Sequence, residues 1–185
     1  MRRIVLASAS PRRKELIKHI SDDVLCVPSG EDETLPDGIS ASETPMLLSA
    51  LKARCVAKDY PEDVVIGSDT VVIFGEEILT KPLSKEDAYA KLKTLSGNKH
   101  KVITACTIIA DGREHTFSEE TLVEFYDLED KLILDYIASG ACDDKAGAYG
   151  IQDKGSLFVK GIEGDYFNVV GLPISRLYRE LKDFV

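Results

Sequence analysis

The sequence predicts an α/β protein built around a mixed sheet, and three observations carry this prediction. Apolar segments of strand type alternate with segments of helical periodicity along the 185 residues. Two turn sequences, Gly75-Glu76-Glu77 and Asp111-Gly112, join neighbouring strand segments as hairpins, so part of the sheet is expected to be antiparallel. The chain also has no GxGxxG fingerprint and no Walker loop, which argues against a purely parallel dinucleotide-binding sheet.

The first elements expected are a strand over residues 4–7, a tight turn and a helix. Ser10 suits the capping position of that helix, and Pro11 suits its first helical position. Arg12 and Arg13 then fall in the first turn, where the helix dipole disfavours each cation by about 0.3–1 kcal/mol. A bound anion, held by backbone N–H groups and guanidinium groups, would offset that cost. Two solvated surface arginines are equally compatible with this segment.

The later strands and helices follow from the same periodicities and from their end signals. Apolar segments rich in β-branched residues predict the strands, at residues 24–27, 64–74, 102–110, 116–126, 157–162 and 166–170. Apolar residues three or four positions apart predict helices that begin at Thr44-Pro45, at Ser84, near Leu132 and at Pro173. The helix near Leu132 is expected to end at Gly140.

The composition excludes several classes of protein. A formal net charge of −9 argues against a nucleic-acid or anionic-membrane binder, although a local basic pocket for a small anion remains compatible with it. No apolar segment approaches the length of a membrane span, and the apolar residues near the N-terminus are too few for a signal peptide. The four cysteines and three histidines are scattered, so no zinc site is expected and a cytoplasmic location with reduced thiols is the simplest interpretation.

The strand over residues 64–74 contains a polar group, Gly67-Ser68-Asp69-Thr70, within an otherwise apolar run. Burying the Asp69 carboxylate there would cost several kcal/mol unless it is paired, bound to a metal or placed at a cleft. Asp69 is therefore a candidate catalytic residue. Gly67 would allow a bend or a close approach of another backbone. The alternative is a turn or bulge in which Asp69 is a satisfied cap.

Four basic residues are candidates for binding an anionic ligand. Lys52 lies on the expected helix after residue 44, and Lys81 stands directly before a proline. Taken singly, each lysine is typical of a solvated surface. Together with Arg12 and Arg13, they offer a candidate cradle for a triphosphate.

Two further polar residues are weaker candidates. Glu33 lies in an acidic loop over residues 31–34, where a surface charge is the simpler interpretation. Residues 144–152 mix charges with small side chains, which is typical of a loop whose backbone comes close to another group. Gln152 ends this segment, and its amide could pair with the edge of a nucleobase because it offers a donor and an acceptor. It could equally be a surface polar residue.

Six segments in chain order resemble the Maf family of nucleoside triphosphate pyrophosphatases: residues 8–13, residues 67–71, Lys81-Pro82, Ser96-Gly97 with His100 and Val102, residues 144–152, and residues 169–173. The resemblance covers nearly the whole chain. It implies a single domain over residues 1–185, similar to the inosine triphosphate pyrophosphatases. Its two lobes would share a mixed, twisted sheet flanked by helices and would surround a central active-site cleft. It also implies that the protein is often a homodimer.

The resemblance also implies roles for individual residues. Asp69 matches the catalytic base, and Glu33 with Asp69 matches the positions linked to a divalent metal, Mg²⁺, Mn²⁺ or Co²⁺. The phosphate-binding positions are Ser8, Arg13, Lys52 and Lys81. The positions that separate the branches of the family are Arg12, Thr70 and Gln152, and here they resemble the branch acting on dTTP and UTP. After Gln152 this chain has Asp153, where Gly is common in the family.

The expected function is hydrolysis of dTTP and UTP, and of modified pyrimidine nucleotides as further candidates, to a nucleoside monophosphate and pyrophosphate. The expected partner is this nucleoside triphosphate substrate, with neither nucleic acid nor membrane. Two alternatives stay open. One is a pyrophosphatase acting on 7-methyl-GTP or on many nucleotides. The other is a non-catalytic regulator of cell division, as the family's older name of septum-formation inhibitor suggests.

Overall fold

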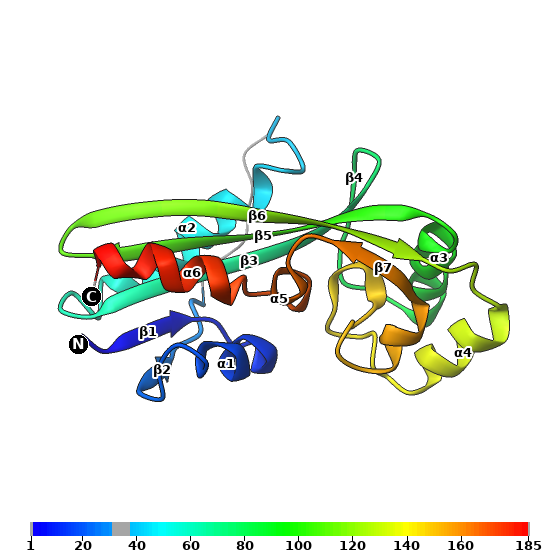
Figure 1. The fold of residues 1–185 in the computed structure, drawn as a ribbon, viewed down its shortest axis with the longest axis horizontal. Helices are drawn as coiled ribbons and strands as arrows, with labels where there is room; N and C mark the ends of the chain where they lie inside the picture. The colour runs from blue at the N-terminus through cyan, green and yellow to red at the C-terminus, as the bar shows by residue number, and fades with distance from the viewer. Residues whose placement is uncertain (1, 31–37, 185) are drawn as a thin grey trace. The chain divides into compact units, whose positions relative to one another are not determined.

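The computed structural model describes residues 2–30 and 38–184 (Figure 1). Its strands are β1 (Ile4–Ala7), β2 (Val24–Cys26), β3 (Val64–Phe74), β4 (Glu77–Leu79), β5 (Lys99–Ala110), β6 (Arg113–Phe125) and β7 (Val159–Glu163). Its α-helices are α1 (Pro11–Ile17), α2 (Thr44–Ala57), α3 (Lys85–Leu95), α4 (Asp130–Ala138), α5 (Tyr166–Val170) and α6 (Ile174–Glu180). Three short 3₁₀ helices complete the described chain: η1 (Ala146–Ala148), η2 (Lys154–Phe158) and η3 (Leu181–Asp183). In the described part of the chain, no helix is long and apolar enough to cross a membrane.

The strands form one seven-stranded sheet in the order β2-β1-β3-β5-β6-β7, with β4 paired to β3. Strand β1 is parallel to both β2 and β3, whereas β4 runs antiparallel to β3 and β7 antiparallel to β6. The predicted mixed α/β sheet is therefore confirmed. Between β5 and β6, Asp111 and Gly112 have φ values of 54° and 70°. Two successive positive values are what a tight two-residue hairpin turn requires.

The chain folds into two compact units. The first unit comprises Met1–Thr70, Thr104–Glu119 and Gly171–Val185, and the second comprises Val71–Ile103 and Glu120–Val170. Three strands, β3, β5 and β6, have residues in both units.

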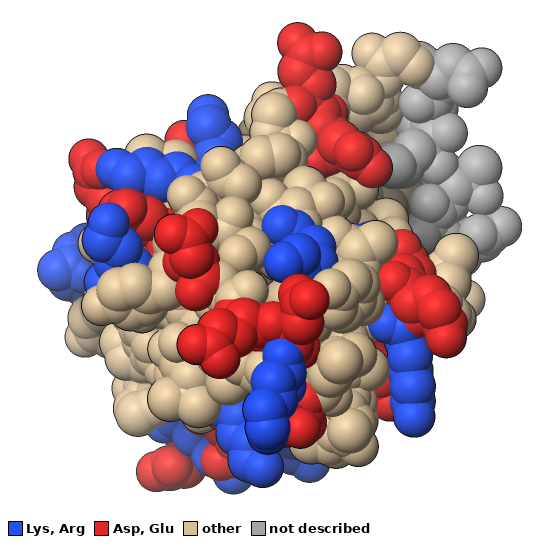
Figure 2. All heavy atoms as spheres, turned by 90° about the vertical axis from the view of Figure 1, so that its right-hand side faces the viewer, with Lys and Arg blue, Asp and Glu red and all other residues tan. Residues whose placement is uncertain are grey.

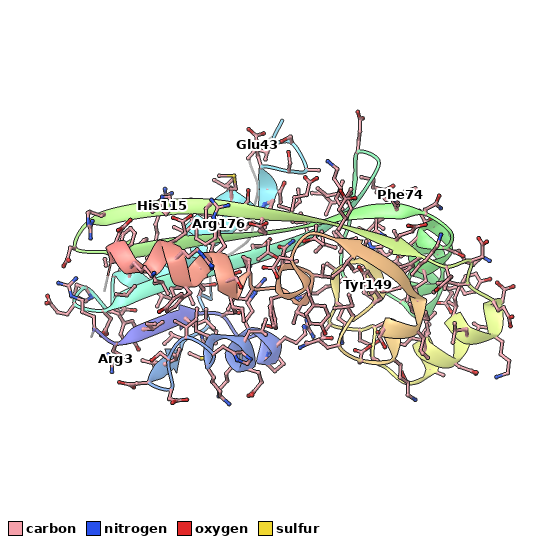
Figure 3. The ribbon with its side chains drawn as sticks, viewed as in Figure 1. Arg3, Glu43, Phe74, His115, Tyr149 and Arg176 are labelled. Carbon is pink, nitrogen blue, oxygen red and sulfur yellow. The ribbon has the colours of Figure 1, made fainter. Side chains whose placement is uncertain are left out.

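The first unit buries apolar side chains between β1, β3 and helix α2. Val5, Val56 and Val65 form one of its core clusters. Helix α6 lies along β6 (Figure 1), where ion pairs join the two elements. His115 on β6 lies 3.0 Å from the Glu180 carboxylate, which also pairs with Arg176. Figure 3 labels His115 and Arg176. At the start of α1, Ser10 caps the helix and Pro11 occupies its first turn, as predicted.

The core of the second unit is rich in aromatic side chains. Phe125, Tyr149 and Phe158 are buried there, with ring centroids of neighbouring pairs 4.8–5.8 Å apart. His100 is buried among them and its Nε2 lies 2.8 Å from the Tyr149 hydroxyl (Figure 3 labels Tyr149). Within the described residues, the His100 Nδ1 atom has no hydrogen-bond partner. A charged imidazole would be poorly solvated here, and burial lowers the pKa of His100 from 6.5 to about 4.

The surface of this unit carries mixed charges. On the face that Figure 2 shows, Lys and Arg side chains are interspersed with Asp and Glu side chains. Lys93 on α3 pairs with Asp130 on α4, and Lys131 pairs with Asp135 one turn along α4. Exposed pairs of this kind contribute at most about 1 kcal/mol each. The charge on this face is thus of both signs.

Two predicted strands are corrected by the structure. Residues 166–170 were expected to form a strand but form helix α5. The Asp165 carboxylate accepts the Phe167 N–H at 2.8 Å, which starts the helical turn, and the buried Asn168 amide donates to the Val102 carbonyl. The strand expected over residues 157–162 begins later, at Val159. Helix η2 precedes it because the Asp153 side chain accepts the Gly155 N–H.

Replacing His100 by Gln should make the protein lose less stability when the pH is lowered. Between pH 6.5 and 4 the unfolded chain binds a proton at His100 and the folded chain does not. The contribution of neutral His100 to the free energy of unfolding is therefore fully present above pH 6.5. It is lost as the pH falls towards 4, by about 3 kcal/mol in total. Urea unfolding at pH 7 and pH 4.5 should show a smaller drop for His100→Gln than for wild type. The exposed His19→Gln variant should match wild type, and equal drops in all three proteins would contradict the expectation.

Candidate active site

A buried ion pair joins β3 to α2. The Lys52 Nζ lies 2.7 Å from the Asp69 Oδ1, and the two side chains are only 13% and 11% exposed. The sequence predicts that Asp69 must be paired, metal-bound or at a cleft, and Lys52 supplies the pairing. Each charge offsets part of the desolvation cost of the other, so a carboxylate is tolerated inside the first unit.

Gly67 explains why helix and strand come this close. A Cβ at position 67 would lie 2.1 Å from the Ser49 carbonyl oxygen and 2.7 Å from the Ala53 nitrogen, so only glycine fits against the α2 backbone. Alternate residues of a strand share a face, and Asp69 therefore points to the same side as Gly67. Lys52 lies about one turn beyond Ser49. The close approach expected at Gly67 is confirmed, and it places Lys52 beside Asp69.

The Arg13 guanidinium joins its own helix to strand β3 and to the segment at Gly171, all in the first unit. Its Nε donates to the Gly171 carbonyl at 2.8 Å, its Nη1 to the Ser68 carbonyl at 2.8 Å, and its Nη2 to the Thr70 hydroxyl at 2.9 Å. Nη1 also lies 3.4 Å from the Ser8 hydroxyl. Every nitrogen of the guanidinium thus has an acceptor within the protein. The phosphate contact that the resemblance implies for Arg13 would have to share these donors.

Thr70 is fixed from a second side by a residue that the sequence analysis did not single out. Its hydroxyl oxygen lies 2.9 Å from that of Thr104 on β5, which is completely buried. A guanidinium can only donate, so Thr70 accepts from Arg13 and has a single hydroxyl hydrogen left to direct elsewhere. No local signal distinguishes Thr104 from any other threonine of a strand, because its partner is 34 residues away.

The remaining predicted residues are distributed as follows. Ser8 is buried at the end of β1, where its hydroxyl accepts the Ser10 N–H at 3.2 Å, and Arg12 is half-buried in α1. Lys81 and Gln152 are exposed residues of the second unit, so their association with Asp69 stays a prediction. Glu33 lies outside the described residues. The central cleft expected between two lobes also stays a prediction.

The close approach expected in residues 144–152 is confirmed, and the neighbours are parts of the same unit. A Cβ at Gly147, which has φ +68°, would lie 2.9 Å from the Val72 Cγ1. A Cβ at Gly150 would lie 2.5 Å from the Lys145 Cε. The small residues of this segment are therefore required by packing within the chain.

A divalent cation would find few protein ligands in the described site. Among residues 2–30 and 38–184, no three His, Cys, Asp or Glu side chains gather as a metal-binding group. Asp69 offers carboxylate oxygens, one of which accepts from Lys52. Mg²⁺ is commonly held by one or two carboxylates together with substrate phosphates and water. The donor set therefore fits a cation that binds together with a nucleotide.

Comparison with known proteins identifies the family. A family model described as Maf-like protein matches residues 3–184. The chain belongs to this family. It is 48% identical over 182 residues to a protein of Geobacillus sp. (strain WCH70) named dTTP/UTP pyrophosphatase, and the match covers 98% of both chains. It is 47% identical over 184 residues to a protein of the same name from Bacillus anthracis, covering 100% of this chain and 96% of the relative.

Solved structures confirm the fold expected for a Maf family member. The Ham1 protein of Staphylococcus aureus superposes with a TM-score of 0.55 at 17% identity, and the match covers 98% of each chain. A HAM1 protein from Coxiella burnetii gives a TM-score of 0.54 at 15% identity, covering 99% of this chain and 100% of that one. At these identities the likeness concerns the fold alone.

Replacing Arg13 by Lys should destabilise the protein although the charge is kept. A lysine ammonium is a single point and cannot reach three acceptors spread over Gly171 and two residues of β3, Ser68 and Thr70. Leaving buried acceptors unsatisfied should cost about 2–4 kcal/mol in the free energy of unfolding, as measured by urea denaturation. Lys14→Ala, a change at the exposed neighbouring residue, should stay within about 0.5 kcal/mol of wild type. If Arg13→Lys unfolds like wild type, the three hydrogen bonds do not hold these segments.

Proposed function

We propose that this protein hydrolyses dTTP and UTP to the nucleoside monophosphate and pyrophosphate. Full-length relatives at 47–48% identity bear the name dTTP/UTP pyrophosphatase, which supports the substrate class. The structural observation that carries the proposal is the Lys52–Asp69 pair at 2.7 Å, a nearly buried carboxylate beside a cation. Charged side chains are seldom this deeply buried, and a buried carboxylate paired with a cation is a candidate for a functional role.

In the proposed reaction, water attacks the α-phosphorus and gives up its proton to the Asp69 carboxylate. The bond between the α-phosphorus and the oxygen bridging to the β-phosphate breaks, and pyrophosphate leaves with the electron pair. Lys52 keeps the Asp69 carboxylate in place through its hydrogen bond to Oδ1. An ordinary Asp is a weak base, with a pKa of about 3.9, so the attacking water must itself be made more acidic.

The triphosphate carries about four negative charges, which the site must neutralise. We assign binding of the phosphates to Ser8, Arg13, Lys52 and Lys81, of which the arginine and the two lysines carry the positive charge. Arg13 would contribute mainly its charge, because its N–H groups already have protein acceptors. A divalent cation, Mg²⁺, Mn²⁺ or Co²⁺, held by Asp69 and Glu33, would supply further charge neutralisation and would acidify the water.

We assign recognition of the base to Arg12, Thr70 and Gln152. A uracil or thymine ring presents an N–H group between two carbonyl oxygens, and an amide, a guanidinium and a hydroxyl can each pair with such an edge. The hydrogen bonds with Arg13 and Thr104 fix the Thr70 oxygen in one position. The homodimer and the cytoplasmic location expected from the sequence remain predictions.

The activity is tested by incubating the purified protein with dTTP, UTP, GTP and 7-methyl-GTP in Mg²⁺, Mn²⁺ or Co²⁺ and separating the products. Monophosphate plus pyrophosphate from dTTP and UTP is the expected result. Asp69→Asn keeps the shape but removes the proton acceptor, so turnover should fall roughly 10²–10⁴-fold. The exposed Asp59→Asn variant should retain wild-type turnover. Diphosphate plus phosphate as products, a preference for 7-methyl-GTP, or an active Asp69→Asn protein would each contradict the proposal.

Gln152→Glu should lower the activity towards pyrimidines relative to purines. A carboxylate cannot donate to a ring carbonyl and repels it, whereas a purine edge with an N–H group should suffer less. The expected cost for dTTP and UTP is about 1–3 kcal/mol of transition-state binding, measured as the change in kcat/KM. Asn98→Asp, the same chemical change at an exposed residue of the second unit, should leave the ratio of pyrimidine to purine activity unchanged. An unchanged ratio in Gln152→Glu would show that Gln152 does not recognise the base.

A further inference from the structure

The loop that carries Gln152 is tied on both sides to one buried side chain. The Tyr136 hydroxyl, from helix α4, accepts the Gly150 N–H at 3.0 Å. The same hydroxyl donates to the Asp153 Oδ1, also at 3.0 Å. Gly150 precedes Gln152 by two residues and Asp153 follows it directly. A single phenol oxygen therefore binds the backbone two residues before Gln152 and the side chain directly after it, while Gln152 itself is exposed.

Asp153 has further partners that hold it in place. Its Oδ1 also accepts the Gly155 N–H at 2.9 Å, which caps helix η2. Its Oδ2 lies 3.5 Å from the Nζ of Lys145, whose ammonium donates to the Ala141 carbonyl at 2.6 Å. The Lys145 side chain passes over Gly150, so close that a Cβ there would lie 2.5 Å from Cε. We call Tyr136, Lys145 and Asp153 the loop clamp.

The protonation of Tyr136 suits both of its hydrogen bonds. Burial raises the pKa of the Tyr136 hydroxyl, which therefore keeps its proton at neutral pH. A neutral phenol has one hydrogen to donate to Asp153 and a lone pair for the Gly150 N–H. The Tyr136 ring packs edge-on against Phe158, with centroids 4.9 Å apart, so the hydroxyl itself is held by the aromatic core.

Fixing a loop before the ligand arrives increases affinity and selectivity. Ordering a free backbone costs conformational entropy, and a loop that is already ordered avoids that cost on binding.

We propose that Tyr136 and Asp153 are positioning residues that hold Gln152 for recognition of the pyrimidine, although neither is assigned a contact with the nucleotide. The inference rests on the proposed function, in which Gln152 recognises the base. Its consequence is that nucleotide selectivity depends on a hydroxyl of the second unit's core.

The first test is a double-mutant cycle on kcat/KM for dTTP and GTP. Tyr136→Phe removes the hydroxyl and keeps the ring. In the otherwise wild-type protein it should lower kcat/KM for dTTP about 5–30-fold, with GTP changed less than about 2-fold. In a Gln152→Ala background the same change should alter the dTTP value less than about 2-fold. The exposed Tyr126→Phe variant is the matched control and should leave both nucleotides unchanged. An equal loss for dTTP and GTP, or a loss that persists in the Gln152→Ala background, would mean a structural role only.

A second pair of variants separates the geometry of Asp153 from its charge. Asp153→Asn keeps an oxygen that accepts from Tyr136 and Gly155, so its ratio of dTTP to GTP activity should stay within about 3-fold of wild type. Asp153→Ala loses both hydrogen bonds and should shift the ratio about as far as Tyr136→Phe does. If Asn and Ala shift the ratio equally, the hydrogen bonds to Oδ1 do not position Gln152.

Amide hydrogen exchange tests the clamp without any nucleotide. In Tyr136→Phe the Gly150 N–H loses its acceptor and should exchange about 10-fold faster, while amides of β5 should keep their rates. An unchanged Gly150 rate overturns the clamp even if the protein is an active pyrophosphatase. If the wild type hydrolyses none of the nucleotides, the proposed function fails and the selectivity inference fails with it, whereas a faster Gly150 exchange would still establish the clamp.

Discussion

The hydrogen bonds of Arg13 begin where the pairing of β1 ends. Strand β1 pairs with β3 only as far as Ala7 and Gly67. One residue further along β3, the Ser68 carbonyl accepts from the Arg13 Nη1 at 2.8 Å instead of from a strand. The guanidinium thus continues the hydrogen bonding of β3 beyond the last residue that pairs with β1, and its planar set of donors reaches Thr70 as well. The turn that leads into α1, the polar part of β3 and the segment before α6 are all placed by this one group.

Because successive side chains of a strand point to opposite faces, the adjacent residues Asp69 and Thr70 of β3 lie in different surroundings. Asp69 faces α2, where it forms an ion pair with Lys52. Thr70 faces the other way, towards Arg13 and Thr104, in a network of hydroxyl and guanidinium groups. Under the proposed function, a change on one face would therefore alter proton transfer, and a change on the other face would alter base recognition.

The sequence predicts those features whose cause lies within a few residues. The Ser10 cap, the close approach at Gly67 and the hairpin at Asp111-Gly112 depend on local backbone requirements, and all three are present. Helix α5 was predicted as a strand because its residues favour strands, whereas a cap and the distant contacts of Asn168 decide the conformation. In the site, the need to pair Asp69 was predictable from its apolar surroundings. The acceptors of Arg13 were not, because they lie 55–158 residues away in the sequence.

The way the chain passes between its two units bears on how it is made. The second unit consists of Val71–Ile103 and Glu120–Val170, so all of its residues exist once synthesis has reached position 170. The first unit contains the N-terminal segment but also needs Gly171–Val185, including the Gly171 carbonyl that Arg13 binds. Domains usually fold in the order in which the ribosome produces them. Here the order is inverted: the unit that begins the chain is the last to be completed, and the bond from Arg13 to the Gly171 carbonyl can form only after residue 171 has been added.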